Sequence, residues 1–299
     1  MEWEDCKKGY ENYLKLEKSL SQNSVDAYIN DISKLIYFFN NSLEQAAPDK
    51  VELQDLKSFL EWLNERRVSP RSQARTISGI KSFYKYLLIE NKISNDPTAL
   101  LESPKIGRKL PDILSMEEID ELINAVDLEK QEGQRNKAML ETLYSCGLRV
   151  SELVNLKITN LFFDQGFIKI EGKADKERLV PVSNQAVYEI NKYFNDYRSS
   201  LKICKDSENI LFLNRRGRKL SRVMIFTIIK NLADKIGLKK KISPHTFRHS
   251  FATHLVNGGA DLRVVQEMLG HESILTTEIY THLDMEYLKS TINQFHPRS

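Results

Sequence analysis

Six side chains between residues 149 and 280 are of the types that an enzyme needs to transfer a phosphoryl group. A tyrosine hydroxyl loses its proton at a pKa of about 10, so a tyrosine nucleophile needs a base, and a histidine suits that task. Two guanidinium groups can hold the phosphate oxygens through paired charge-assisted hydrogen bonds as those oxygens gain charge. A lysine in a turn can return a proton to the leaving oxygen. The six side chains are Arg149, Lys173, His245, Arg248, His271 and Tyr280.

Two of the six are spaced to lie at the start of a helix. His245 and Arg248 are three residues apart, so they share one face of a helix. Ser243 can cap that helix, and Pro244 can open it. Because the first turn of a helix presents unpaired N–H groups, this segment would attract an anion such as a phosphate.

Each of the six also has a structural explanation when it is taken alone. An arginine after a helix end can pair with a carboxylate at the surface, as Arg149 can with Glu152. A lysine in a turn is usually solvated, and a histidine and an arginine one turn apart are usually structural. A histidine after a glycine can lie in a loop, and a tyrosine after an apolar stretch is usually core. The chemical interpretation therefore depends on the six occurring together.

Helices must position these residues, and the first hundred residues have a helical pattern throughout. Asn23 or Ser24 is predicted to cap the second helix, and Ser69-Pro70 to open the fourth. Apolar residues at helical spacing predict these helices over residues 2–20, from 24 onward, over 53–65 and over 70–90.

The remainder of the chain is predicted to mix helices with a small sheet. Ser115 can cap one helix, and another over residues 135–146 would end at Gly147. Residues 162–170 predict two strands around a turn, and a second turn, which contains Lys173, leads into a strand over 178–182. The expected fold is mainly α with a small antiparallel β-sheet in the C-terminal domain, an α+β fold.

Positive charge is concentrated in two segments, 66–89 and 214–233, which contain no acidic residue. Either segment alone can be an ordinary solvated face, and the net charge of +3 says little about partners. Two such segments in different halves of the chain indicate a polyanion that is held from two sides. The side chains predicted to bind DNA are Arg71, Arg75, Lys81, Arg215, Arg216, Arg218 and Arg222.

Composition argues against several classes of protein. The cysteines, Cys6, Cys146 and Cys204, are odd in number and widely spaced, which disfavours a disulfide framework and a CxxC metal site. No stretch approaches the roughly 20 apolar residues of a membrane helix, and the acidic N-terminus lacks the apolar region of a secretory signal. We therefore expect a cytoplasmic protein without membrane association, metal or other cofactor.

In type and order, the six residues resemble the catalytic set of the tyrosine recombinase (phage integrase) family. The surrounding phrases resemble the family too: GLRVSEL at 147–153, PHTFRHSFAT at 244–253 and LGH at 269–271. The length and the ending HPRS resemble the XerC/XerD branch, and the resemblance covers the whole chain.

The resemblance implies a role for each of the six. Tyr280 would attack the scissile phosphate of duplex DNA and form a 3′-phosphotyrosyl link, which retains the bond energy for rejoining. The two arginines would clamp the non-bridging oxygens, and the lysine would protonate the 5′-hydroxyl as it leaves. His245 would act as the general base, and His271 would donate a hydrogen bond to the phosphate.

The resemblance also implies a two-domain DNA clamp. Residues 1–104 would form a helical, SAM-like core-binding domain, 105–111 a linker, and 112–299 the catalytic domain. Residues 283–292 have apolar side chains at helical spacing and resemble the C-terminal helix that docks on a neighbouring subunit in this family. The chain begins with the first helix of the core-binding domain, so a preceding arm-binding domain is not expected.

The partners implied by the resemblance are a duplex recombination site and three further copies of a recombinase, in a tetramer on two DNA sites. A second related recombinase and a DNA translocase of the FtsK type are further partners, and chromosome dimer resolution at cell division is the implied role. Alternatives with the same chemistry are a mobile-element integrase and a type IB topoisomerase. A non-enzymatic DNA-binding protein would not need the nucleophile. A zinc hydrolase built on His245, His249 and His254 lacks the HExxH glutamate.

Overall fold

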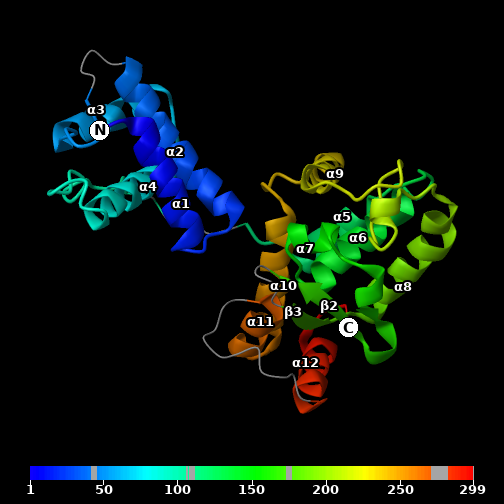
Figure 1. The fold of residues 1–299 in the computed structure, drawn as a ribbon. Helices are drawn as coiled ribbons and strands as arrows, with labels where there is room; N and C mark the ends of the chain where they lie inside the picture. The colour runs from blue at the N-terminus through cyan, green and yellow to red at the C-terminus, as the bar shows by residue number, and fades with distance from the viewer. Residues whose placement is uncertain (42–45, 106, 108–111, 173–176, 271–281, 299) are drawn as a thin grey trace. The chain divides into compact units, whose positions relative to one another are not determined.

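The computed structural model describes residues 1–299 apart from 42–45, 106, 108–111, 173–176, 271–281 and 299, and only the backbone of residues 282–285 (Figure 1). The chain folds as two compact units, Met1–Lys109 and Leu110–Ser299. The boundaries 1–104, 105–111 and 112–299 that the sequence suggests stay predictions.

The first unit consists of helices in its described residues. They are α1 (Trp3–Leu16), α2 (Gln22–Asn41), α3 (Leu53–Glu65) and α4 (Pro70–Ile89). The sequence predictions for α3 and α4 are confirmed, and the Ser69 side chain caps α4 by accepting the backbone N–H of Ser72. The predicted cap of α2 at Asn23 or Ser24 is wrong, because α2 begins at Gln22, and the backbone N–H groups of Ser24 and Val25 in its first turn donate to the Ser21 carbonyl.

Aromatic rings fill the core of this unit. Tyr10 and Phe83 are fully buried, with ring centroids 5.3 Å apart in an edge-to-face arrangement. One carboxylate is buried beside them in the same unit: Asp31 accepts hydrogen bonds from Arg75 Nη2 at 2.9 Å and Thr76 Oγ1 at 3.0 Å. These bonds connect α2 to α4. The sequence pattern alone shows only an apolar face on each of the two helices.

The second unit adds a three-stranded antiparallel sheet in the order β1-β2-β3, with Ile168 of β2 opposite Val180 of β3. The predicted mainly α fold with a small antiparallel sheet is therefore confirmed. Its principal elements are α5 (Met116–Asn124), α6 (Gly133–Ser145), α7 (Val150–Val154), β1 (Leu161–Phe162), β2 (Phe167–Glu171), β3 (Glu177–Pro181), α8 (Asn184–Lys192), α9 (Arg222–Lys235), α10 (Pro244–Gly258), α11 (Leu262–Leu269) and α12 (His282–Phe295).

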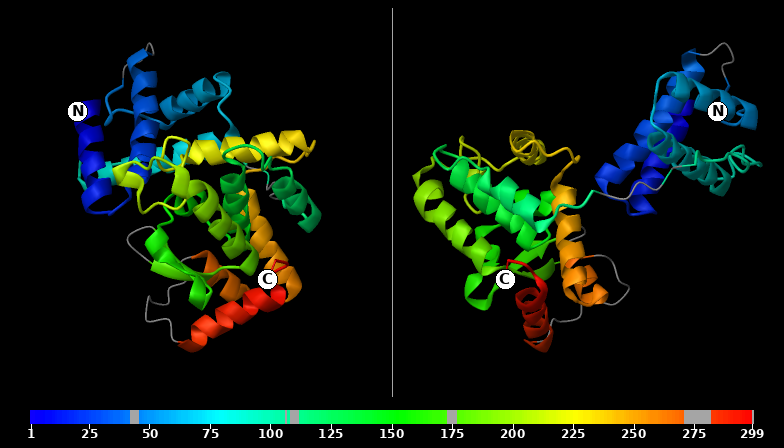
Figure 2. Two further views of the ribbon diagram at one scale, coloured as in Figure 1. Left: turned by 90° about the vertical axis from the view of Figure 1, so that its right-hand side faces the viewer. Right: turned by 180° about the vertical axis from the view of Figure 1, so that it is seen from behind.

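Helix α10 is central to the packing of this unit. It contacts α6, α9, α11 and α12, and its Phe247 and Phe251 are fully buried. Both views of Figure 2 show α11 and α12 at the same end of the unit, and each also contacts β3. Leu288 and Ile292 of α12 are buried against the unit's own core.

No helix in the part of the chain that the structure describes is long and apolar enough to cross a membrane.

Candidate active site

Arg149 lies at the junction of two helices. Helix α6 ends at Ser145 with Cys146 as its C-cap, and Gly147 follows with a φ of +55°, a left-handed conformation that reverses the chain. A Cβ atom on Gly147 would lie 2.4 Å from Phe251, so glycine is required for packing as well as for the turn. Arg149 is then the N-cap of α7, and the Glu152 carboxylate accepts both its backbone N–H and its Nη1, each at 2.8 Å.

Arg248 reaches the same place from α10. Pro244 opens this helix as the sequence predicts, and the backbone N–H of Ser243 donates to Thr246 Oγ1 at 3.1 Å. The Arg248 side chain is 8% exposed, and its Nη1 donates to the Gly147 carbonyl at 2.7 Å. The carbonyl that accepts this bond belongs to the turn that places Arg149, so the two arginines are positioned by one segment.

The C-terminal end of α11 collects three guanidinium groups. The carbonyls of three consecutive residues, 268, 269 and 270, each accept a hydrogen bond from a different arginine. Arg178 Nε donates to the first at 2.9 Å, Arg248 Nη2 donates to the second, and Arg149 Nη2 donates to the third at 3.1 Å. The last carbonyls of a helix carry partial negative charge, which favours cations there. The next residue in the chain is His271.

Glu152 is the only carboxylate that the described residues place among these arginines. Its oxygens receive Arg149 and also Arg178, whose Nη1 and Nη2 donate at 2.8 and 2.9 Å, and Arg248 Nη1 lies 3.9 Å away. Burial would raise the pKa of Glu152, but its bonds and charge interactions with Arg178 and Arg149 outweigh burial and lower that pKa. Three arginines against one ionised carboxylate leave a net positive charge at the site.

This positive charge contributes to a lowered pKa of Arg248. Burial and, after it, the neighbouring charge of Arg149 lower the pKa of Arg248 to about 10. The guanidinium therefore stays charged at neutral pH, but it is short of negative partners. A phosphate would supply that missing charge.

The remaining members of the sequence-predicted set are less fully placed. His245 is exposed in the first turn of α10, on the helix that also carries Arg248. Lys173, His271 and Tyr280 lie outside the described residues. The structure thus brings Arg149 and Arg248 together, and the catalytic roles of all six residues stay predictions.

The zinc alternative gains nothing from the structure. His254 Nδ1 lies 2.7 Å from the Tyr144 hydroxyl, within hydrogen-bond distance. Across the described residues no three histidine, cysteine or carboxylate side chains gather as metal ligands.

Four of the residues predicted to bind DNA are exposed on one segment of the second unit. Arg215, Arg216 and Arg218 occupy a tight loop, closed by a hydrogen bond of 2.7 Å from the backbone N–H of Asn214 to the Arg218 carbonyl. Arg222 follows at the start of α9, which Ser221 caps. Hydrogen bonds within the loop and from Cys204 hold its backbone, and the three arginines are exposed.

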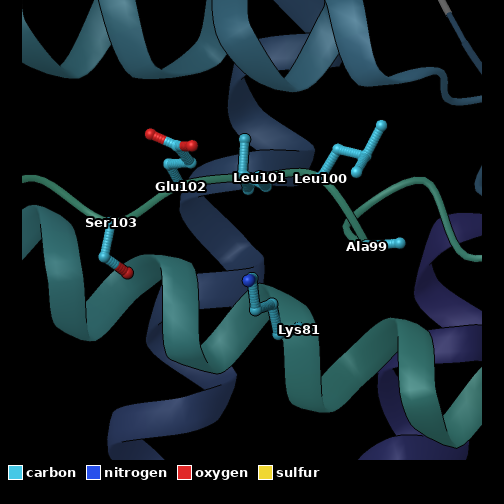
Figure 3. Close-up of a pocket in the computed structure, with 6 residues that line it drawn as sticks. All are labelled: Lys81, Ala99, Leu100, Leu101, Glu102 and Ser103. Carbon is cyan, nitrogen blue, oxygen red and sulfur yellow. The ribbon is translucent and has the colours of Figure 1, made fainter.

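The three residues on α4 have different surroundings. Arg71 is exposed, whereas the Arg75 guanidinium is already paired with the buried Asp31. Figure 3 shows Lys81 pointing from α4 toward the segment that carries Leu101 and Glu102, where it lines a shallow pocket. DNA binding by these side chains stays a prediction, and the Arg75 guanidinium is already engaged within its own unit.

Sequence reasoning missed Arg178 and the burial of Glu152. The sequence suggests Arg149 and Glu152 as a surface pair, but Glu152 is only 7% exposed. Arg178 appears in the sequence as the start of a strand, yet it is 8% exposed. Its alternation with Val180, on the inward face of β3, is the one signal that could have identified it.

Two family models match the chain. The phage integrase family matches residues 112–287, and the SAM-like N-terminal domain of phage integrases matches residues 8–91. The chain belongs to the phage integrase family of tyrosine recombinases. As such, it is a site-specific recombinase that binds DNA and cuts and rejoins its strands.

Relatives and solved structures agree with this membership. The chain is 42% identical to tyrosine recombinase XerD of Oceanobacillus iheyensis over 288 residues, 96% of this chain and 97% of that one. It is 43% identical to XerD of Chlorobaculum tepidum over 99% of this chain and 97% of that one. The fold is similar to that of XerH bound to a palindromic difH substrate, with a TM-score of 0.71 and 23% identity over 95% of this chain and 83% of that one.

Proposed function

We propose that this recombinase cleaves DNA through Tyr280 and that Arg149 and Arg248 hold the scissile phosphate. The observation that carries the proposal is the convergence of these two guanidinium groups at the end of α11, directly before His271. The buried Arg248 provides a charge that water screens little, and Arg149 is half-exposed, so a phosphate can approach it.

The remaining steps follow from proton balance. The Tyr280 hydroxyl gives its proton to His245, its oxygen forms the bond to phosphorus, and Lys173 protonates the departing 5′-oxygen. His271 donates a hydrogen bond to the phosphate, whose added charge the two arginines stabilise. Removal of one such donor typically raises the barrier by roughly 3–4 kcal/mol.

A nicked suicide duplex tests the nucleophile, because the DNA fragment downstream of the cut diffuses away and traps the covalent adduct. Tyr280→Phe should bind this DNA as the wild type does and form no adduct. An adduct in the Tyr280→Phe protein would refute the assignment. Lys173→Ala retains the nucleophile but lacks the proposed proton donor for the 5′-oxygen, so it should form the adduct slowly. It is the matched control, because its defect is confined to that one proton transfer.

We also propose that the exposed arginines at 215, 216, 218 and 222 bind the phosphate backbone beside the site, with Arg71, Arg75 and Lys81 of α4 gripping the duplex from the core-binding domain. The exposure of these arginines, three of them on a hydrogen-bonded loop, supports this role. Phosphate contacts position a protein on DNA but do not read its sequence. The target sequence must therefore be read by other contacts.

We propose chromosome dimer resolution in the cytoplasm as the biological role. Identity of about 42% to recombinases named XerD, along nearly the full length of both chains, supports this proposal. The reaction would need a tetramer on two DNA sites, with a second related recombinase and a DNA translocase of the FtsK type as partners. Mapping the protected DNA by crosslinking in cells tests the role: one chromosomal site is expected, whereas sites at the ends of a mobile element would contradict it.

The C-terminal helix would join the subunits of that tetramer. Because Leu288 and Ile292 are part of the unit's own core, deletion of the tail would disturb folding. Tyr287 is the better probe, because it is 56% exposed on α12. Tyr287→Ala should lower recombination and leave binding of one protomer to DNA unchanged. Equal loss of both activities would argue against a docking helix.

A further inference from the structure

Arg178 connects three separate parts of the second unit through one buried guanidinium group. Its Nη1 and Nη2 form a paired interaction with Glu152 of α7, and its Nε bonds the carbonyl of Met268 in α11. Arg178 itself lies on β3, which follows the connection that contains Lys173. The guanidinium uses all three of its nitrogens in these contacts.

The backbone next to the guanidinium packs closely against it. Gly270 ends α11 with a φ of +63°, and a Cβ atom there would lie 3.1 Å from Arg178 Cδ and Nη1. The guanidinium thus packs directly against the residue whose carbonyl accepts Arg149 Nη2. Both partners of Arg149, Glu152 and Gly270, are in contact with Arg178.

We propose that Arg178 is a positioning residue of this recombinase: it holds Glu152 and the end of α11 in one arrangement and through them fixes the guanidinium of Arg149. The inference rests on the proposed role of Arg149 as a phosphate clamp. Arg178 does not touch the phosphate, because both of its bond-forming sides face protein.

A positioning role differs from simple stabilisation because Arg178 fixes the positions of both Glu152 and Gly270, the two groups that bond Arg149. Without Arg178, Glu152 is left with Arg149 at 2.8 Å and Arg248 at 3.9 Å as its close cations, so it would draw Arg149 away from the phosphate. A displacement of about 1 Å in a group that holds the reacting atoms can lower a rate by roughly 10²-fold. A lysine at position 178 would keep the positive charge but could not form the two parallel hydrogen bonds that the guanidinium makes with Glu152.

The test uses the full chain and a nicked suicide duplex that carries the DNA site protected by the wild type. Cleavage is measured at saturating DNA, below the melting temperature of every variant, and the dissociation constant is measured separately. Arg178→Met should lower the cleavage rate constant by on the order of 10²-fold and Arg178→Lys by about tenfold, with DNA affinity unchanged within about twofold.

A matched control and a double-mutant cycle separate positioning from stability. Arg198 is also buried in this unit, but its guanidinium bonds only backbone carbonyls at 208–211, so Arg198→Met should lower the melting temperature and leave the cleavage rate constant at its wild-type value. In a Glu152→Gln background, Arg178→Met should cost less than about fivefold, since the two residues act together. Should Arg178→Met not fold, the cycle is made with Arg178→Lys.

Three outcomes would overturn the inference: a wild-type rate constant in both Arg178 variants, the same loss with and without Glu152→Gln, or an equal loss in Arg198→Met. Arg149→Ala is measured beside them. A wild-type rate in Arg149→Ala would overturn the phosphate clamp of the proposed function, whatever Arg178 does.

Discussion

His296, near the end of the chain, should make the second unit sensitive to mild acid. The imidazole is 3% exposed and packs against Tyr144 and Phe251, with ring centroids 5.0 and 5.4 Å away. Its Nδ1 accepts the backbone N–H of Arg298 at 3.1 Å, so the neutral ring carries its proton on Nε2. Within the described residues, Nε2 has no hydrogen-bond partner that could stabilise a second proton's charge.

The magnitude follows from the pKa of this group. Burial, with smaller contributions from His254 and Arg298, lowers the pKa of His296 from 6.5 to about 3. Below pH 6.5 the unfolded chain binds a proton that the folded chain does not, so the free energy of unfolding falls as the pH falls, until the folded pKa is reached. Each pH unit in that window costs about 1.4 kcal/mol, which gives about 2 kcal/mol between pH 7 and pH 5.

The perturbation that tests this is His296→Gln, which removes the titrating group and keeps a polar side chain of similar size. The variant should be less stable than the wild type at pH 7, because it loses ring packing, but it should lose about 2 kcal/mol less between pH 7 and pH 5. Burial also lowers the pKa of His254, which remains in both proteins, so the comparison isolates His296.

Urea unfolding at the two pH values provides the assay, with an internal reference supplied by the sequence. Both tryptophans, Trp3 and Trp62, belong to the first unit, so tryptophan fluorescence reports that unit, whereas far-ultraviolet circular dichroism also reports the second. His296→Gln should change only the dichroism transition. His249→Gln removes an exposed histidine from α10 and should keep the wild-type pH dependence. An equal pH dependence in wild type and His296→Gln would refute the reasoning.

Three further predictions concern the stability of each unit and the binding of DNA. Gly147→Ala should destabilise the second unit by about 2–5 kcal/mol, measured by dichroism, because the left-handed backbone and the clash with Phe251 both oppose a Cβ atom. Asp31→Ala should destabilise the first unit by about 2–3 kcal/mol, measured by tryptophan fluorescence, since the buried Thr76 hydroxyl loses its acceptor. Arg218→Ala should reduce the slope of log K against log salt by about 0.9 in DNA binding, and an unchanged slope would remove Arg218 from the interface.

The sequence determined the local structure because the signals for it lie within a few residues of one another. Ser69-Pro70 specifies the start of α4, Ser115 the start of α5, and Gly147 the end of α6, each through backbone groups of one turn. The prediction was wrong at the start of α2, where Ser21, Asn23 and Ser24 are all of types that favour a helix start and the helix begins after the first of them.

The residue types of the proposed active site also came from the sequence, because phosphoryl transfer demands a small set of functional groups and the six resemble the set of the family in type and order. The sequence even suggested the pairing of Arg149 with Glu152, which are one helical turn apart. It placed this pair at the surface, however, whereas the structure buries Glu152 and leaves Arg149 half-exposed.

Only the tertiary structure decided how the arginines are held. Arg178 and Glu152 are 26 residues apart, and the carbonyls that receive three guanidinium groups come from the end of α11, about 90 residues beyond Arg178. No spacing in the sequence encodes these contacts, because carbonyl acceptors have no residue signature and a buried ion pair depends on what excludes water from it. The chemistry of this recombinase can be read along the chain, whereas the positions of its charges arise from packing across it.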